Sequence, residues 1–326
     1  MRPAGSGSAD TRYSRGLNTF ARLTAAATFM LIFTGGLVTS TGSGLAVPDW
    51  PLSLGQFFPA MIGGVLFEHG HRLVAGSVGL LMLSLAVWIW RHEPRIVLRR
   101  IASLALAAVV LQALLGGLTV LLRLPVSVSV AHAGLAQIFF CLSLVLAVCT
   151  GRAWMQSTAR ATDLSRPSLK LLAWVSTGLI FGQLLLGAIM RHIGAGLAIP
   201  DFPLSFGRLL PPEWTLPIAI HFAHRVGALV VSAVVLWTVS QVERCHSGRP
   251  ELLRPARLLG GLLVLQVCLG ALTVWTARMV LPTTLHVSVG AALLATSLLI
   301  GLRAGRLLSS QRESRVGAAI AEGGVA

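Results

Sequence analysis

The sequence predicts an all-α integral membrane protein, in which eight transmembrane helices form two pseudo-symmetric parallel four-helix bundles. Three observations lead to this fold class: an apolar composition, eight long apolar segments, and an internal repeat of about half the chain. Of the 326 residues, 55% are hydrophobic and 11% are charged. A soluble domain needs more charge on its surface than this, so a lipid bilayer is the expected solvent and partner.

Eight apolar segments are long enough to cross a bilayer, which requires about 20 mostly apolar residues. The predicted spans are 18–40, 62–90, 101–122, 127–150, 169–190, 216–242, 258–277 and 283–303. The first span follows basic residues and could be taken for a secretory signal. A matching segment recurs in the second half, where a signal peptide has no role, so we interpret residues 18–40 as a span.

Arginines gather in alternate loops and predict the orientation. They precede the first span at Arg12, Arg15 and Arg22, and recur in the 91–100, 151–168 and 243–257 loops, whereas residues 40–61 contain none. The positive-inside rule then makes both termini cytoplasmic, in a cell (inner or plasma) membrane, with loops 40–61 and 191–215 facing outward. A nucleic-acid-binding protein would gather its charge on a folded polar surface, so the net charge of +15 predicts no nucleic-acid partner.

The cysteines do not indicate a disulfide or a metal site. Cys141, Cys149, Cys245 and Cys268 show neither CxxC spacing nor a pair within one outward loop.

An internal repeat relates the two halves at an offset of 152 to 154 residues. GSGLAVPDWPLSLG (42–55) matches GAGLAIPDFPLSFG (194–207), and QALLGGLTV (112–120) matches QVCLGALTV (266–274). Each unit has an even number of spans, so both copies share one orientation. The predicted divisions are an N-terminal tail (1–17), a first bundle (18–150), a linker (151–168), a second bundle (169–303) and a C-terminal tail (304–326).

Four histidines within the predicted spans also follow the repeat. His71 corresponds to His224, and His132 corresponds to His286. Each lies about two to three helical turns from the outward end of its span, so facing helices can present His71 opposite His132 and His224 opposite His286. Imidazole is a strong iron ligand and bundle cores commonly hold heme. The alternative is that each ring bonds a neighbouring helix, but two pairs in register favour heme.

Charged neighbours accompany these histidines. Arg72 and Arg225 follow His71 and His224 directly, and could pair with heme propionates or extend to lipid headgroups. Glu68 precedes His71 by three residues and so shares its helix face. The second half has His221 at that position, which suggests one scaffold with diverged chemistry. Alternatively, Glu68 only hydrogen-bonds a ligand histidine.

The remaining histidines carry weaker predictions. We expect His69 to be a loop or helix-end residue that points away from the Glu68 and His71 face, His192 to begin an outward loop, and His92 and His246 to lie in cytoplasmic loops.

The EHGHR segment (68–72), the PDWP-containing loop and the paired His132 and His286 segments resemble the heme A synthase family over residues 18–303. The resemblance implies an eight-span oxidoreductase that converts heme O to heme A for terminal cytochrome oxidases. It oxidises a ring methyl to formyl, most simply by two hydroxylations and loss of water. The implied partners are heme O as substrate, a heme O synthase (farnesyltransferase) and the cytochrome oxidase assembly pathway.

By position, the resemblance also implies a division of labour. The first bundle is the substrate heme half, where His71, His132 and Arg72 bind heme O and Glu68 is catalytic. The second is the heme b half, where His224, His286 and Arg225 bind the cofactor.

This chain departs from one pattern in the family, since Val47 and Ser53 stand where some members have cysteines. The alternative function is a di-heme b-type electron carrier without heme-modifying activity, which would also need paired histidines. A transporter with inverted repeats is disfavoured because these repeats are parallel.

Overall fold

The computed structural model describes residues 13–156 and 161–309, and within them eight helices are long and apolar enough to cross a membrane. Every predicted span is therefore confirmed, and the chain is an all-α multi-pass membrane protein. Arg12, residues 157–160 of the predicted linker and the outer parts of both predicted tails lie outside the described residues. The eight helices are α1 (Arg15–Ser40), α2 (Gly64–His92), α3 (Ile96–Leu121), α4 (Val126–Cys149), α6 (Leu169–His192), α7 (Leu216–Cys245), α8 (Pro250–Trp275) and α9 (Val280–Leu307).

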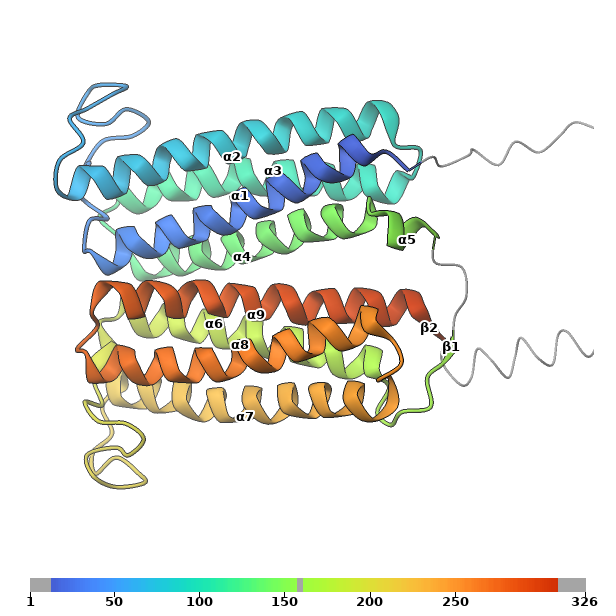
Figure 1. Cartoon of the computed structure of the whole chain (residues 1–326). Helices are drawn as coiled ribbons and strands as arrows, with labels where there is room; N and C mark the ends of the chain where they lie inside the picture. Colours follow the sequence, from blue (N-terminus) through green and yellow to red (C-terminus); the bar gives the residue numbers. More distant parts are fainter. Residues whose placement is uncertain (1–12, 157–160, 310–326) are drawn as a thin grey trace, which may run out of the picture.

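The helices pack as two groups of four. α1 contacts α2 and α4, and α3 closes the first group by contacting the same two helices; α6, α7, α8 and α9 make the corresponding contacts in the second. Figure 1 shows the groups as two layers, which meet through α1 and α4 on one side and α6 and α9 on the other. The arrangement of these groups as two pseudo-symmetric four-helix bundles stays a prediction.

Local sequence explains how several helices begin. Ser14, Ser168 and Thr215 precede α1, α6 and α7, and each side chain accepts a hydrogen bond from a backbone N–H in the first turn. Such caps satisfy donors that a helix start leaves free. Short turns connect α3 to α4 and α8 to α9. Each turn contains two residues with positive φ, Arg123–Leu124 in the first and Ala277–Arg278 in the second. The two pairs occupy matching repeat positions, so both helical hairpins have the same turn.

Short elements lie at both ends of the long helices. α5 (Arg152–Gln156) follows α4, β1 (Ala161–Thr162) pairs in parallel with β2 (Leu308–Ser309), and the 3-10 helix η1 (Ala195–Leu197) begins the second long loop. We call the end of the helices that carries loops 41–63 and 193–215 the loop end. The arginine-rich loops lie at the opposite end, as predicted from the alternation.

Each group has its own core of buried apolar side chains. Met82 and Leu85 on α2 are fully buried in the first group, as are Leu259 on α8 and Ile300 on α9 in the second. Many other apolar side chains on the helices are exposed in the isolated chain, for example Leu229, as expected where the surrounding solvent is hydrocarbon. The buried polar residues at the loop end require a chemical explanation.

Candidate functional site: paired histidines at the loop end

The structure brings the four predicted histidines to the same depth. His71, His132, His224 and His286 are the eighth, seventh, ninth and seventh residues of α2, α4, α7 and α9, all of which start at the loop end. At 1.5 Å per residue, each lies about two turns inside the bundle. His71 is within electrostatic reach of His132, and His224 of His286. His71 and His132 thus lie in the first group of helices and His224 and His286 in the second, and their pairing as ligands stays a prediction.

A glycine on the neighbouring helix faces each histidine ring. A Cβ added at Gly35 would lie 3.0 Å from Cε1 of His71, and one at Gly187 would lie 3.0 Å from Cε1 of His224. The same contact would be 3.1 Å at Gly116 against His132 and at Gly270 against His286. Since carbon atoms pack at about 3.5–4.0 Å, no larger residue fits without moving the ring.

Hydrogen bonds through Nδ1 hold the rings of His71 and His286. Nδ1 of His71 lies 2.9 Å from Oγ1 of Thr34, whose own proton goes to the carbonyl of Leu31 at 3.0 Å. Nδ1 of His71 is therefore the donor, and a ring held in this way presents Nε2 to iron. Nδ1 of His286 faces the backbone carbonyl of Gln266 at 3.2 Å, and its Nε2 lies 3.4 Å from the side-chain amide nitrogen of Gln266.

Glutamine amides also hold the rings of His132 and His224. The amide of Gln112 lies 3.3 Å from Nε2 of His132 and donates to its backbone carbonyl at 3.0 Å. The amide of Gln183 lies 3.1 Å from Nδ1 of His224 and donates to that carbonyl at 2.7 Å. Nδ1 of His132 is buried without a hydrogen-bond partner among the described residues. A buried ring nitrogen without a partner is a group that a ligand would satisfy.

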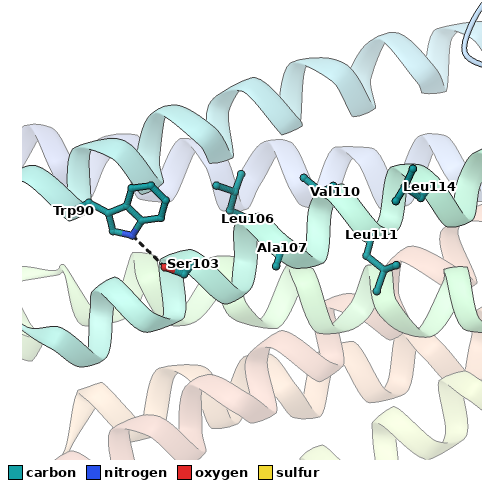
Figure 2. A pocket seen from close by; sticks show the side chains of 7 residues that line it. All are labelled: Trp90, Ser103, Leu106, Ala107, Val110, Leu111 and Leu114. Atoms are coloured by element: carbon teal, nitrogen blue, oxygen red, sulfur yellow. Dashed lines mark hydrogen bonds between the residues drawn. The ribbon is translucent and has the colours of Figure 1, made fainter.

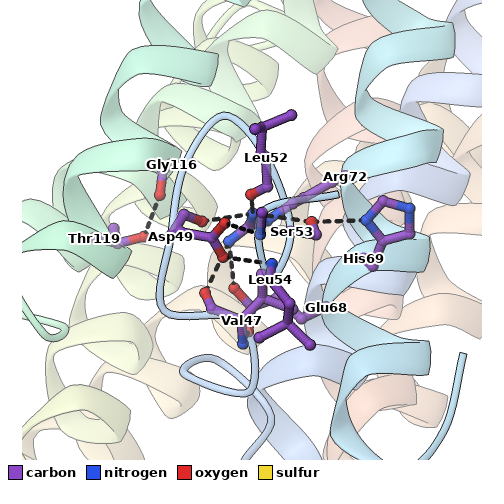
Figure 3. A network of polar contacts seen from close by, with 11 residues as sticks. Val47, Asp49, Leu52, Ser53, Leu54, Glu68, His69, Arg72, Gly116 and Thr119 are labelled. Carbon is purple, nitrogen blue, oxygen red and sulfur yellow. Dashed lines mark hydrogen bonds and ion pairs between the residues drawn. The ribbon is translucent and has the colours of Figure 1, made fainter. Parts of the chain in front are cut away.

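Glu68 is buried and fully engaged. Its Oε2 accepts from the backbone N–H of Val47 at 2.8 Å, and its Oε1 accepts from Nη2 of Arg72 at 2.7 Å (Figure 3). His221, the corresponding residue of the second half, accepts from the backbone N–H of Ile199 at 3.3 Å. Both side chains are thus in one structural position, where they bind the equivalent loop residue. The first half differs in holding a negative charge there.

Arg72 and Arg225 fasten the loops. Arg72 donates to the carbonyls of Val47, Asp49 and Leu52, and Arg225 donates to those of Ile199, Asp201 and Leu204, which are the same three repeat positions. Nε of Arg225 is buried without a partner among the described residues. The predicted contact of both arginines with propionates stays a prediction, and their structural work as loop clamps was not anticipated.

The two long loops lie across the ends of the helices, where Arg72 and Arg225 hold their backbone carbonyls. Asp49 accepts from the backbone N–H groups of Leu54 and Gly55 and so fixes the turn in Figure 3. The ring of Trp50 lies on α3, where a Cβ at Gly117 would be 2.7 Å from its Cδ2. The first loop therefore bridges α2 and α3 above the histidines, and Asp201 fixes the second loop in the same way.

Sequence reasoning missed the surroundings of His69. This residue belongs to α2 and is buried, and its Nδ1 lies 2.8 Å from Oγ of Ser53. The sequence therefore did not predict the contact between His69 and the first loop. His92 ends α2 at the opposite end of the helices, and His246 follows α7 beside Asp163. His192 ends α6 at the loop end, where it lies within electrostatic reach of His132.

One groove between α2 and α3 lies away from the histidines. About 420 Å³ in volume, it is apolar apart from a hydrogen bond from Trp90 to Ser103 (Figure 2). It is lined by Trp90, Ser103, Leu106, Ala107, Val110, Leu111 and Leu114. These residues belong to α2 and α3, on an open face that lipid would cover. Among the described residues, no three His, Cys, Asp or Glu side chains gather as a metal site.

Comparison with known proteins identifies the family. Residues 63–298 match the family described as Cytochrome oxidase assembly protein. The chain belongs to this family. It is 34% identical to the heme A synthase of Symbiobacterium thermophilum over 251 residues, which cover 74% of this chain and 80% of that protein. It is 32% identical to the heme A synthase of Geobacillus kaustophilus over 274 residues, or 80% and 83% of the two chains.

A third relative, the heme A synthase of Shouchella clausii, is 30% identical over 236 residues, 69% of this chain and 77% of that protein. The matches to this oxidase assembly family include both halves and all four histidines, since the family match runs from residue 63 to residue 298. The resemblance predicted from the sequence is confirmed, and the electron-carrier alternative is not favoured.

Proposed function

We propose that the chain is a heme A synthase, an oxidoreductase that converts a ring methyl of heme O to a formyl group and so supplies heme A to terminal oxidases. One observation carries the proposal beyond family membership. Two histidine pairs at one depth are built alike, with a glycine behind each ring, while an acid stands beside one pair only. Two sites of one design, with one of them chemically different, fit a substrate site and a cofactor site.

The histidine pairs fit an iron porphyrin. Each bundle offers two imidazoles from different helices, and the glycines behind the rings leave no room for adjustment in that direction. We assign heme O to His71 and His132, and heme b to His224 and His286. Bound there, heme b supplies reversible one-electron redox chemistry. The residues of the second half would hold it and keep water and lipid away from it.

The reaction sets the requirements on the first half. Conversion of a methyl to a formyl group releases four electrons, and four protons when the oxygen is written as coming from water. Positive charge therefore develops near the substrate, and protons must be accepted there. Glu68 is the buried acid of the first half that lies on the helix face of His71, three residues away. Its carboxylate would stabilise that charge or accept a proton.

The contacts of Glu68 suit this role. Arg72 and the backbone N–H of Val47 fix the orientation of the carboxylate. Arg72 also donates to the carbonyl of Val47, so a displacement of the first loop would move both hydrogen-bond donors of the carboxylate. In the second half, the ring of His221 binds the equivalent loop residue, Ile199, without a carboxylate.

Arg72 and Arg225 remain proposed partners of the heme propionates. They lie one residue beyond a proposed iron ligand, and Nε of Arg225 is a buried donor without a partner among the described residues. A propionate would supply the missing acceptor.

Family and topology suggest the setting. We place the protein in the cell membrane with both termini in the cytoplasm, so that the loop end faces outward, and propose that a heme O synthase delivers its substrate. Reporter fusions to the 243–257 loop test the orientation. An activity there that requires an external location would reverse it.

Expression in a host that makes heme O but no heme A tests the reaction. Extracted hemes are separated by chromatography, and the wild-type chain should yield heme A. Glu68→Gln should lower its yield strongly. Glu243→Gln also removes an acid paired with an arginine, but at the opposite end, and should leave the yield unchanged. Binding of two hemes without any heme A would instead support the electron carrier.

A further inference from the structure

The tips of the two long loops expose bulky apolar side chains at matching repeat positions. Phe57 and Phe58 are 77% and 82% exposed, and Leu209 and Leu210 are 85% and 62% exposed. Single apolar residues on a surface are ordinary, but adjacent pairs at the same place in both repeats require a common cause. Neither pair contacts the histidine sites or belongs to the loop clamps described above.

The loops are built so that they present these pairs outward. In the first loop, the carboxylate of Asp49 fixes the turn immediately before the pair, and Ser53 and Gln56 exchange backbone hydrogen bonds across it. Pro59, which follows the pair, is buried. The second loop repeats this arrangement with Asp201, the Ser205–Arg208 pair and a buried proline, Pro211. The chain on both sides of each tip is therefore fixed, so the exposed apolar pairs belong to an ordered part of each loop.

The tips point away from each other. Figure 1 shows the first loop extending beyond α2 and the second beyond α7, on opposite flanks of the molecule and away from the interface between the two groups of helices. A partner protein on one side would reach only one tip. The lipid of one leaflet surrounds both flanks and reaches both.

Apolar surface continues from each tip to the lipid-facing helix below it. Ile62 and Leu66 are exposed between the first tip and the body of α2. Trp214 and Leu216 are exposed between the second tip and α7. Tryptophan is favoured at the headgroup level of a bilayer, and amphipathic surfaces of this kind lie with their apolar side chains among the upper acyl carbons.

We propose that Phe57–Phe58 and Leu209–Leu210 insert into the lipid interface of the leaflet at the loop end. Each loop is then fixed at two places: to its helix through Arg72 or Arg225, and to the bilayer through its tip. The lipid thereby holds in place the segments that cover the histidine pairs. This inference concerns the loops and does not depend on the proposed reaction.

Spin labels test the inference in the full-length chain reconstituted into nanodiscs of phosphatidylcholine and phosphatidylglycerol. Labels are attached at Phe58→Cys and Leu210→Cys in a variant whose four cysteines are changed to alanine. Matched control labels at Gln56→Cys and Glu213→Cys probe exposed polar positions of the same loops. Oxygen partitions into hydrocarbon and a nickel chelate into water, so the ratio of their relaxation effects reports depth.

We expect the oxygen-to-nickel ratio to be several-fold higher at 58 and 210 than at 56 and 213. Equal ratios at all four positions would overturn the proposal and place the tips in water, where a protein partner becomes the better occupant. If the cysteine-free chain does not fold, Phe58→Trp and Gln56→Trp in the native background replace it. Acyl-brominated lipids should quench the added fluorescence at 58 more than at 56, and equal quenching would overturn the proposal.

Discussion

Replacing Gly187 by alanine tests the glycine contact behind a proposed heme ligand. The new Cβ would lie 3.0 Å from Cε1 of His224, against an ordinary carbon contact of about 3.5–4.0 Å. The ring must therefore retreat by about 0.5 Å. Overpacking of this kind costs about 1–3 kcal/mol, whereas alanine in place of glycine within a helix stabilises by about 1 kcal/mol. The net cost is about 0–2 kcal/mol, so the protein should fold.

The effect should appear at the heme. A site must hold its ligands to within about 0.5 Å, so the displaced imidazole binds iron less well. A loss of about 1.4 kcal/mol corresponds to about tenfold in affinity. We expect purified Gly187→Ala to keep its thermal unfolding temperature within a few degrees and to lose heme b to apomyoglobin about tenfold faster than wild type. The assay follows the absorbance change as the acceptor takes up heme.

Gly182 provides the matched control, since it lies on the same helix and an added Cβ there would meet nothing within 4 Å. Gly182→Ala should lose heme b at the wild-type rate and be equally or more stable. If the two variants release heme at the same rate, the contact with His224 does not position a ligand. That result would remove the main geometric reason for assigning heme to this ring.

Three further variants test the acid and the first loop. Glu68→Gln should lower heme A formation by about 10²-fold or more and leave the b-type absorbance intact, and loss of that absorbance as well would make Glu68 structural. Hydrogen bonds from the backbone N–H groups of Gly55 and Leu54 hold the pKa of Asp49 below its ordinary value of about 3.9. Only the carboxylate form accepts both bonds. Their contribution to the order of the loop is therefore present above about pH 4 and is lost as the pH falls through the lowered pKa. Hydrogen exchange at Gly55, corrected for intrinsic rates, should rise on acidification in wild type and be raised at all pH values in Asp49→Asn; a pH-independent wild type would contradict this. Gly117→Ala places a Cβ 2.7 Å from Cδ2 of Trp50, so proteolysis of the 41–63 loop should accelerate, and an unchanged cleavage rate would show that the loop does not rest on α3.

The spans could be predicted from the sequence because each depends on local composition. About 20 apolar residues in a row are sufficient for a spanning helix whatever the rest of the chain does. The paired histidines were predictable for a related reason: the repeat marks them twice, at one depth. His71 and His224 stand at matching positions, and so do His132 and His286.

The contacts around the histidines could not be predicted in this way. Gly187 and Gly182 are both glycines of one apolar helix, and nothing in their sequence context says which one faces a ring. Packing between helices decides it, and that depends on the rotation of each helix about its axis. The repeat held a partial signal, since Gly35 and Gly187 occupy matching positions.

The loop contacts were hidden for a different reason. The position of His69 between Glu68 and His71 indicates only which face of the helix it occupies. Its hydrogen-bond partner is Ser53, which lies on a loop 16 residues earlier. Arg72 was predicted to face a ligand because a buried charge requires a partner. The structure supplies that partner from Glu68 and backbone carbonyls of the first loop. The sequence thus predicted that Arg72 requires a partner, but not that Glu68 and the loop carbonyls provide it.

The central claim is that the two histidine pairs hold different hemes, and the hemes extracted from purified single variants test it most directly. The chain is expressed in a host that makes heme O, and each variant is analysed by chromatography and pyridine hemochrome spectra. His224→Ala should lose heme b and keep heme O or heme A, whereas His71→Ala should keep heme b and lose the other. Loss of heme b from His71→Ala with retention in His224→Ala would contradict the account.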